Sequence, residues 1–332
     1  MEYTIVEYVW IGGCGELRSK TRVFYEEDIY SVSDLPIWTY DGSSTEQADG
    51  SASEVFLHPK RMFRCPFRRP NGMIVMCDTY LPDGTPARYN HRHDALKIFE
   101  KYADQKPWHG LEQEFFIYDR AYNQPFNFDP NGKQGQYYCS VGGNNAFMRK
   151  ISDEHLEACL YAGIKIMGTN AEVAPSQWEY QIFGEGIDAA DQLWISRYIL
   201  ERISEKYNSH INYHPKPLKG DWNGSGCHCN FSIEAMRNKD GINAIMAVMP
   251  KLEAKHSEHM LVYGKYNRER MTEKHETSSY DKFTYGIGSR NTSVRVPNDA
   301  VKGINPYLED RRPAGNCDPY LVTSKILQTI ME

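Results

Sequence analysis

The stretch "HGLEQEFFIYD" (residues 109–119) carries two carboxylates inside an otherwise apolar run. In a β-strand, alternation places Leu111 and Phe115 on one face and Glu112 and Glu114 on the other. The first face is suited to a hydrophobic core. The second face carries charge that would be costly to bury without a partner. The stretch therefore predicts a strand with one packed face and one functional face.

Acidic side chains recur in two later strand-like stretches, "NAEVAPSQWEYQ" (residues 170–181) and "YLEDRRP" (residues 307–313). They contribute Glu172, Glu179 and Glu309. Pro175 interrupts the first stretch, so Glu172 and Glu179 can converge across a bend.

Five Glu side chains in one site would repel one another. Two carboxylates about 6 Å apart repel by about 3 kcal/mol at an effective dielectric of about 20. Either their pKa values rise or cations hold them. Glu oxygens with one imidazole suit Mg²⁺ or Mn²⁺ better than a thiolate-binding metal. The alternative is that each Glu pairs separately with a surface Arg or Lys.

The segment "CHC" (residues 227–229) offers both thiols and an imidazole. Alternation in a strand places Cys227 and Cys229 on the face opposite His228. We therefore expect both thiols in the core and His228 in a different role. The cysteines are scattered, without C-x-x-C pairs, which predicts buried, reduced thiols at positions 14, 65, 77, 139, 159, 227, 229 and 317.

Arginines form a second cluster: Arg270, Arg290, Arg295, Arg311 and Arg312. Guanidinium groups beside metal-binding carboxylates suit the binding of a polyphosphate and phosphoryl transfer. The alternative is surface ion pairing. Neither a P-loop nor a dinucleotide glycine fingerprint is present, and "GGCG" (residues 12–15) predicts only a turn.

Composition narrows the class of protein. The 332 residues have a net charge of -6 and are 40% hydrophobic, which is typical of a globular protein and gives no basic stripe for nucleic acid. The N-terminus lacks the features of a signal peptide, and no apolar run is long enough to span a bilayer. We expect a cytosolic protein that binds neither nucleic acid nor membrane.

The chain changes pattern near residue 86. Residues 1–85 predict a small β-rich domain with strands at residues 3–11, 22–27 and 73–80. Residues 86–332 predict alternating helices and strands, with helices at residues 93–104, 153–162, 187–207, 239–263 and 318–330. We expect Ser152 to be the N-cap of the second helix. Ile195, Ile199 and Ile203 mark the core face of the third.

Taken together, the motifs resemble type II (eukaryotic-like) glutamine synthetase. They run in the family's order: "YDGSST" (40–45), "GLEQEF" (110–115), "YYCSVG" (137–142), "ACLYAGIKIMGTNAEVAPSQWEYQI" (158–182), "WNGSGCHCNFS" (222–232), "HETSS" (275–279) and "YLEDRRPAGNCDPY" (307–320). The resemblance covers nearly the whole chain. It implies an α+β protein, with a β-grasp-like N-terminal domain followed by a catalytic domain whose curved antiparallel sheet is backed by helices.

The resemblance also implies the reaction. ATP phosphorylates the γ-carboxylate of L-glutamate, and ammonia attacks the γ-glutamyl phosphate to give L-glutamine, ADP and phosphate. Two divalent cations, Mg²⁺ or Mn²⁺, would be held by Glu114, Glu172 and Glu179 and by Glu112, His228 and Glu309. The family further implies a homo-oligomer of stacked rings, a decamer, with active sites between adjacent subunits.

The remaining site residues are carried over by the same resemblance. Asp41 would hold ammonium from the adjacent subunit, and Glu276 would close the ammonium pocket and accept a proton. Arg270 matches the position that holds the substrate's α-carboxylate, with Asn223 and Gly224 beside it. Phosphate-contacting positions match Arg290, Arg295 and Arg311. The nucleotide side matches Ser232, Tyr307, Trp108 and Arg237.

Two departures from the family pattern lie before the flap motif "HETS". Glu269 stands where relatives have Arg, and Glu273 stands at a Gly position. Three alternatives to the ligase are ligation of a larger amine, a non-catalytic ring protein, and a glycosidase built on a carboxylate pair. Intact Asp41 and Glu276 argue against the first. The second would have lost metal-binding Glu or phosphate-binding Arg, and the third leaves His228 and the arginines without a role.

Overall fold

The computed structural model describes residues 2–25 and 29–332. The chain divides into two compact units, described here separately. The N-terminal unit comprises Met1–Lys97 and Glu157–Ile164, and the larger unit comprises Ile98–Leu156 and Lys165–Glu332. The domain boundary expected between residues 85 and 86 stays a prediction.

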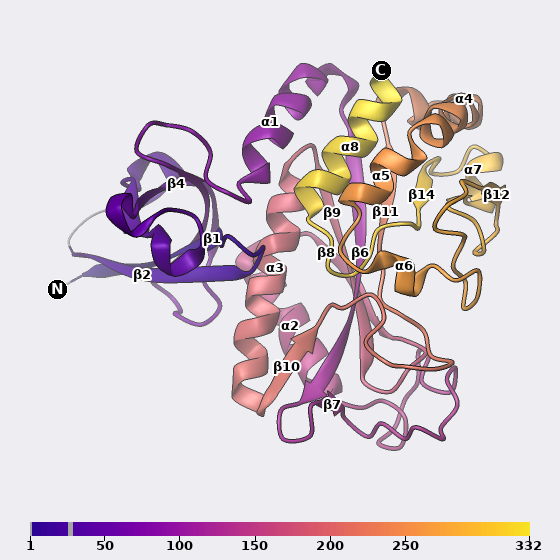
Figure 1. Ribbon diagram of the computed structural model, residues 1–332, viewed down its shortest axis with the longest axis horizontal. Coiled ribbons are helices and arrows are strands. Elements are labelled where there is room, and N and C mark those ends of the chain that lie inside the picture. The colour runs from indigo at the N-terminus through magenta and orange to yellow at the C-terminus, as the bar shows by residue number, and fades with distance from the viewer. Residues whose placement is uncertain (1, 26–28) are drawn as a thin grey trace. The chain divides into compact units, whose positions relative to one another are not determined.

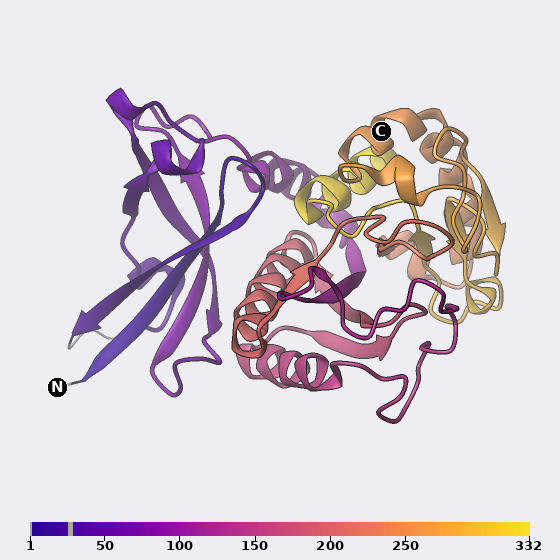
Figure 2. The same ribbon diagram turned by 60° about the horizontal axis from the view of Figure 1, so that its bottom comes forward.

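The N-terminal unit is β-rich, as expected. Its sheet has the order β2-β1-β5-β4-β3, in which β1 and β5 are parallel and the other neighbours antiparallel; Figure 2 shows these strands side by side. The strands are β1 (Tyr3–Ile11), β2 (Leu17–Tyr25), β3 (Trp38–Asp41), β4 (Glu54–Arg64) and β5 (Gly72–Tyr80). The second strand begins five residues before the expected one, and its expected end at Glu26 and Glu27 lies outside the described residues.

Alternation along β1 builds the core of this unit. Val6, Tyr8 and Trp10 are buried together with Leu57 and Val75 of the neighbouring strands. The predicted turn between β1 and β2 is confirmed by Gly15, which has a φ of 85°. That backbone conformation suits a residue without a Cβ.

The larger unit is built on a mixed, mostly antiparallel sheet in the order β12-β13-β14-β11-β6-β9-β8, to which β7 and β10 add beside β6. Among the described strands of this sheet, only the β12–β13 pair is parallel. The strands are β6 (Trp108–Asp119), β7 (Gln124–Pro125), β8 (Ile166–Ala171), β9 (Gln177–Glu185), β10 (Ser209–Asn212), β11 (Cys227–Ser232), β12 (Tyr285–Ile287), β13 (Val294–Val296) and β14 (Leu308–Asp310).

The α-helices of the described residues are α1 (His91–Lys101), α2 (Arg149–Ala162), α3 (Asp188–Ser204), α4 (Gly241–Ala254), α5 (His256–Val262), α6 (Asn267–Arg270), α7 (Asn298–Val301) and α8 (Pro319–Met331). Of these, α3 to α8 lie wholly in the larger unit. The long helix α3 packs against β9, β6 and α8 (Figure 1). Its expected core face is confirmed, because Ile195, Ile199 and Ile203 are fully buried. Among the described residues, no helix combines the length and apolar character that a membrane crossing requires.

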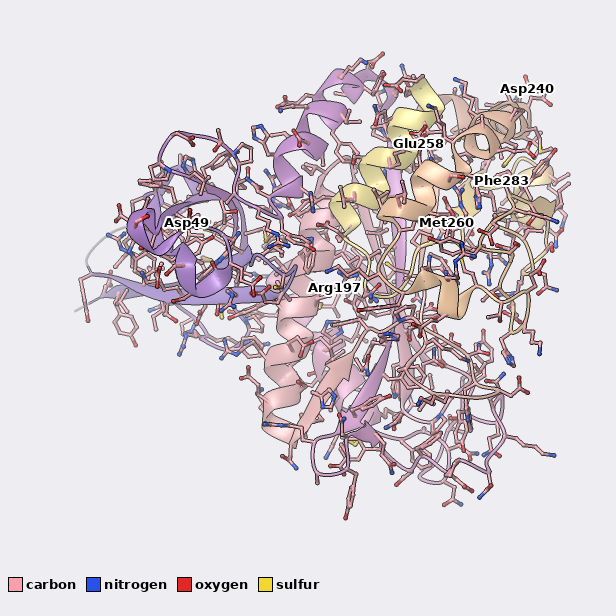
Figure 3. All side chains as sticks on the ribbon, in the orientation of Figure 1. Asp49, Arg197, Asp240, Glu258, Met260 and Phe283 are labelled. Atoms are coloured by element: carbon pink, nitrogen blue, oxygen red, sulfur yellow. The ribbon has the colours of Figure 1, made fainter. Side chains whose placement is uncertain are left out.

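The packed face of β6 is also confirmed. Leu111 and Phe115 are buried, and Gln113 is buried between β6 and α3. Arg197, labelled in Figure 3, extends from α3 and donates two hydrogen bonds to Gln113 Oε1, at 2.9 and 2.6 Å. A buried guanidinium thus ties the helix layer to the central strand.

Two helix predictions were wrong in detail. Ser152 does not cap α2, which begins at Arg149; instead Ser152 is buried and hydrogen-bonds Thr169 at 2.7 Å. The single helix expected at residues 239–263 is two, because Lys255 between α4 and α5 has φ -102° and ψ 11°. Both errors arise where tertiary contacts or local backbone geometry override helical periodicity.

Candidate active site

The functional face of β6 opens into a pocket of about 460 Å³ within the larger unit. Glu112 and Glu114 line it, on the face opposite Leu111 and Phe115. The complete lining is Glu112, Glu114, Tyr138, Asn170, Glu172, Val173, Glu179, Gln181, Asn223, Gly224, His228, Arg270, His275, Glu276, Thr277, Arg290, Arg295 and Arg311. We call this the acidic pocket.

One side of the acidic pocket gathers a possible metal site. Ligand atoms of Glu112, His228 and Glu309 all lie within 4.8 Å of one another. The sheet register explains this, since His228 on β11 is paired with Glu112 on β6, and β14 lies on the other side of β11. His228 Nδ1 lies 3.4 Å from Glu112 Oε2 and 3.6 Å from Glu309 Oε1. Burial, followed by the charge of Arg311, lowers the pKa of His228 well below its usual range. A neutral imidazole in this position can offer a lone pair to a cation.

The cysteines on either side of His228 face away from the pocket, as predicted. Cys227 and Cys229 are fully buried in the core. The expectation of buried thiols was wrong for Cys14 and Cys139, which are exposed. Cys14 Sγ donates to Glu46 Oε2 at 3.3 Å.

Three further carboxylates gather on the other side. Glu179 on β9 is paired with Glu114 on β6, and Glu172 follows the end of β8. Burial is the main cause that raises the pKa of Glu114 to about 8, of Glu172 to about 7 and of Glu179 to about 9, and neighbouring carboxylates add to each shift. Carboxylates in this situation are either protonated or held by cations. The donor set therefore fits a hard divalent cation.

Polar neighbours fix the orientation of these acids. The Gly226 N–H donates to Glu114 Oε2 at 2.7 Å, and the Asn170 amide donates to Glu172 Oε1 at 3.1 Å. Gln181 donates to Glu179. Sequence reasoning missed Asn170 and Gln181, although both belong to strands whose neighbouring Glu were singled out.

Arginines supply the opposite charge. Arg311 Nη1 donates to Glu309 Oε1 at 2.7 Å, and Arg295 donates to the other oxygen of the same carboxylate. Arg290 Nη1 lies 3.9 Å from Glu276 Oε2. Glu309 thus forms ion pairs with arginines, as the alternative considered above expects. Glu309 is buried, however, rather than at the surface. Arg312 does not line the pocket; its guanidinium is fully buried against Asp310.

Arg270 differs from these arginines. It is buried, and Nη2 donates to the carbonyl oxygens of Arg311, Arg312 and Pro313 at 2.8–3.2 Å. Burial lowers the pKa of Arg270 to about 10, so it remains a cation at neutral pH. Its stem passes close to Gly224, where an added Cβ would lie 1.9 Å from the Pro215 carbonyl oxygen and 2.8 Å from Arg270 Cγ. Only glycine fits beside this arginine.

A second, larger pocket of about 770 Å³ contains Trp108, Ser232, Arg237 and Tyr307, together with Met167 and Phe183. We call this the aromatic pocket. The Arg237 guanidinium lies over the Trp108 ring at 4.0 Å, and Arg237 Nη1 donates to Ser232 Oγ at 3.0 Å. Asn230 lines it as well and donates to Glu112 Oε1 of the acidic pocket at 2.6 Å. Sequence reasoning assigned no role to Asn230 and Met167, although both lie within quoted motifs, and it did not single out Phe183.

Asp41 belongs to the N-terminal unit. It is exposed at the end of β3 and accepts hydrogen bonds from Ser43 Oγ and Ser44 Oγ, both at 2.6 Å. These bonds lower the pKa of Asp41 to about 2. The carboxylate is therefore ionised at neutral pH.

The two departures noted before "HETS" lie at separate places. Glu269 is in α6. Glu273 follows it in the left-handed region, with a φ of 63°, and His275 and Glu276 share that conformation at 51° and 59°. A Gly position in the family thus coincides with a backbone that favours glycine.

Comparisons with known proteins agree with this geometry. The family model of the glutamine synthetase catalytic domain matches residues 90–332. The chain is 64% identical over 333 residues to a putative glutamine synthetase of Acanthamoeba polyphaga mimivirus, covering 99% of this chain and 94% of that protein. It is 46% identical over 330 residues to a glutamine synthetase of Tuber borchii, covering 98% and 92%. It is 48% identical over 332 residues to cytosolic isozyme 1-3 of Arabidopsis thaliana, covering 98% and 94%.

A solved structure shares the fold. The cryo-EM structure of Plasmodium falciparum glutamine synthetase superimposes with a TM-score of 0.77 at 20% identity, covering 99% of this chain and 71% of that one. The expected α+β architecture, with a β-rich N-terminal region and a curved sheet backed by helices, is confirmed.

Proposed function

The chain belongs to the eukaryotic-type glutamine synthetase family and catalyses ATP-dependent glutamine synthesis, and we propose that the acidic and aromatic pockets together carry out this reaction. One observation carries the proposal: six Glu, two His and four Arg from distant parts of the sequence line or adjoin a single pocket. Such a set suits phosphoryl transfer to a carboxylate, in which negative charge accumulates on phosphate oxygens.

Two divalent cations fit the donor sets. Glu114, Glu172 and Glu179 would hold one, and Glu112, His228 and Glu309 would hold the other. When bound, Mg²⁺ or Mn²⁺ neutralises charge on the phosphate and carboxylate oxygens and orients them. The raised pKa values of the first set and the neutral imidazole in the second support these assignments.

The arginines bind the reacting anions. Arg270, with Asn223 and Gly224 beside it, would hold the α-carboxylate of glutamate, since a buried guanidinium gives a charge-assisted hydrogen bond. Arg290, Arg295 and Arg311 would contact the phosphates and stabilise the transferring phosphoryl group. Arg290 would act as a catalytic residue. Arg311 would also contact the glutamate substrate.

The aromatic pocket would hold the nucleotide base. Trp108 offers a flat apolar surface, backed by Arg237, while Ser232 and Tyr307 offer hydroxyl groups. The hydrogen bond from Asn230 to Glu112 lies between the two pockets, where the phosphate chain would pass.

Ammonia must arrive as a neutral nucleophile although ammonium dominates at neutral pH. An ionised Asp41, contributed by the adjacent subunit, would hold ammonium and remove its proton. Glu276 would close the pocket and take a proton from the tetrahedral adduct. Exclusion of water matters because an acyl phosphate hydrolyses readily.

Assembly and location follow from the same family. We propose a homo-oligomer of stacked rings, a decamer, in which residues 1–85 of one subunit complete the site formed by residues 86–332 of its neighbour. A cytosolic location is supported by the Arabidopsis relative, which is named a cytosolic isozyme.

The test is phosphate release from ATP by the purified protein with Mg²⁺ and L-glutamate, with and without ammonium, paired with direct detection of glutamine. We expect ammonium-dependent phosphate and an equal amount of glutamine. Phosphate without glutamine, or formation of a γ-glutamyl amide from a larger amine in place of glutamine, would overturn the assignment.

A further inference from the structure

The flap segment, residues 272–279, is held in an unfavourable backbone conformation. Glu273, His275 and Glu276 have φ values of 63°, 51° and 59°, in the left-handed region that side chains with a Cβ disfavour. Such a segment keeps its shape only where contacts compensate. Within the segment, Thr277 Oγ1 accepts from the Thr272 N–H at 3.1 Å and donates to the Lys274 carbonyl at 2.7 Å.

Outside the segment, Glu276 contacts Arg290 and Arg311, and Ser278 contacts Ser293. His275 makes the contacts with the loops at residues 134 and 221–223. Its Nδ1 lies 2.6 Å from Gln134 Nε2, and its Nε2 lies 2.7 Å from Asp221 Oδ1. Gln134 Oε1 in turn accepts from the Asn223 N–H at 2.7 Å. These four residues come from three separate loops, at residues 134, 221–223 and 272–279.

The donor and the acceptor of each hydrogen bond in this series, from Asn223 to Asp221, are fixed. The Asn223 N–H can only donate, so Gln134 must present Oε1 to it and Nε2 to His275. His275 Nδ1 must therefore accept, and its Nε2 carries the proton that is donated to Asp221. Only one orientation of the Gln134 amide and one tautomer of the His275 imidazole satisfy all three hydrogen bonds. The three loops are therefore held in one relative position.

This series of hydrogen bonds adjoins two proposed substrate contacts, Asn223 at one end and Glu276 next to His275. Glu276 follows His275 directly, and Asn223 lines the same acidic pocket. At the Asp221 end, the carboxylate is 87% exposed, so this hydrogen bond can break and reform as the flap segment moves.

We propose that Gln134, His275 and Asp221 form a clasp that holds the flap segment over the acidic pocket and so protects the acyl phosphate from water. The inference rests on the proposed function. All three are positioning residues, because they act through Glu276 and the loop of Asn223.

The chemical consequence is coupling between phosphate release and amide formation. Ammonia or water can attack the acyl carbon of the acyl phosphate and expel phosphate. Attack by ammonia forms the amide of glutamine, whereas attack by water regenerates the carboxylate of glutamate. With the clasp intact, each phosphate is accompanied by one glutamine. Without it, phosphate exceeds glutamine.

The test compares Asp221→Ala with Asp221→Asn, in which the amide oxygen still accepts from His275. Asp240→Ala, an exposed Asp before α4 (Figure 3), is the matched control. We expect the ratio of phosphate to glutamine to rise several-fold in Asp221→Ala and to stay near unity in the wild type, Asp221→Asn and Asp240→Ala. Equal ratios in Asp221→Ala and the wild type would overturn the clasp.

Hydrogen exchange separates failure of the clasp from failure of the proposed function. Amides of residues 272–279 should exchange about five-fold faster in Asp221→Ala than in the wild type, while amides of α8 are unchanged. This readout does not need turnover. If the wild type makes no glutamine, the proposed function fails, and unchanged exchange in the flap segment overturns the clasp independently.

Discussion

Glu114 on β6 lies directly opposite Glu179 on β9, in a pair of antiparallel strands whose other faces are packed in the core. Burial together with the neighbouring carboxylates raises the pKa of both groups, to about 8 and about 9. Two facing, buried carboxylates without a positive partner destabilise a protein core. The cation that we propose between these two side chains accounts for this arrangement.

Replacing Glu114 with Gln should abolish turnover without unfolding the protein. The change keeps the shape of the side chain and its hydrogen bond from Gly226 but removes the charge that binds the cation. We expect at least about a 100-fold loss in phosphate release and an unchanged circular dichroism spectrum. Glu253→Gln, at an exposed position of α4, is the control. Activity within a few-fold of wild type would contradict the ligand assignment.

Replacing Asp41 with Ala should weaken the use of ammonium and leave ATP binding intact. The loss of the carboxylate removes the group proposed to hold and deprotonate ammonium. The expected result is a raised KM for ammonium with an unchanged Kd for ATP. Asp49→Ala, exposed in the same unit and labelled in Figure 3, should behave as the wild type. A raised Kd for ATP in Asp41→Ala would show that the effect is not specific to ammonium.

The subunit origin of Asp41 has its own test. Asp41→Ala and Glu114→Gln subunits are mixed, dissociated and reassembled, and turnover is measured at an ammonium concentration too low for Asp41→Ala alone to be active. If each site combines Asp41 of one subunit with Glu114 of its neighbour, about a quarter of the sites regain both groups. Mixed oligomers that stay as inactive as the parents would place both residues of a site in the same subunit.

Replacing Trp108 with Ala should raise the KM for ATP by about five- to ten-fold, which corresponds to about 1–1.5 kcal/mol of aromatic stacking. The KM for glutamate should not change, because Trp108 lines only the aromatic pocket. Tyr122→Ala, a mostly exposed aromatic beyond the end of β6, is the control. Equal effects on both substrates would point to a general disturbance of β6.

His109 makes the stability of the protein sensitive to acid. Its ring is fully buried between Phe99 and Phe231, and neither nitrogen has a hydrogen-bond partner among the described residues. Burial lowers the pKa of His109 from 6.5 to about 3. The unfolded chain binds a proton below pH 6.5 and the folded chain does not, so stability is complete above pH 6.5 and falls towards pH 3.

The corresponding variant is His109→Phe. Between pH 6.5 and 3 the wild type should lose up to about 1.4 kcal/mol of unfolding free energy per pH unit through this residue, a loss that the variant lacks. Urea unfolding at pH 7 and pH 5 measures the difference. The same pH dependence in both proteins would show that His109 is accessible to protons in the folded state.

Most of what was predicted about this site rests on the alternation of side chains along strands. This alternation placed Glu112 and Glu114 on the open face of β6 and separated His228 from Cys227 and Cys229. The expected convergence of Glu172 and Glu179 across Pro175 agrees with the structure, in which both line the acidic pocket. These relationships depend on the period of a strand and on local bends, which the sequence states directly.

Contacts that depend on register or on loop docking were not predictable. The contact of Gln181 with Glu179 and Asn170 requires the irregular pairing of β8 with β9. His275 and Asp221 are separated by 54 positions and meet only because two loops fold over one pocket. Ser152 has the chemistry of an N-cap, but its hydroxyl is used by Thr169 in the interior. In each case a tertiary contact, rather than local propensity, decides the outcome.

The central claim is that the γ-carboxylate of glutamate is activated by phosphorylation within the acidic pocket. It is tested most directly by supplying glutamate labelled with ¹⁸O in the γ-carboxylate, together with ATP, Mg²⁺ and ammonium, and determining the mass of the released phosphate. Formation of the acyl phosphate followed by attack of ammonia transfers one labelled oxygen to each phosphate. We predict one ¹⁸O per phosphate and one in the glutamine amide. Unlabelled phosphate would show that ATP is cleaved by water and would contradict the account.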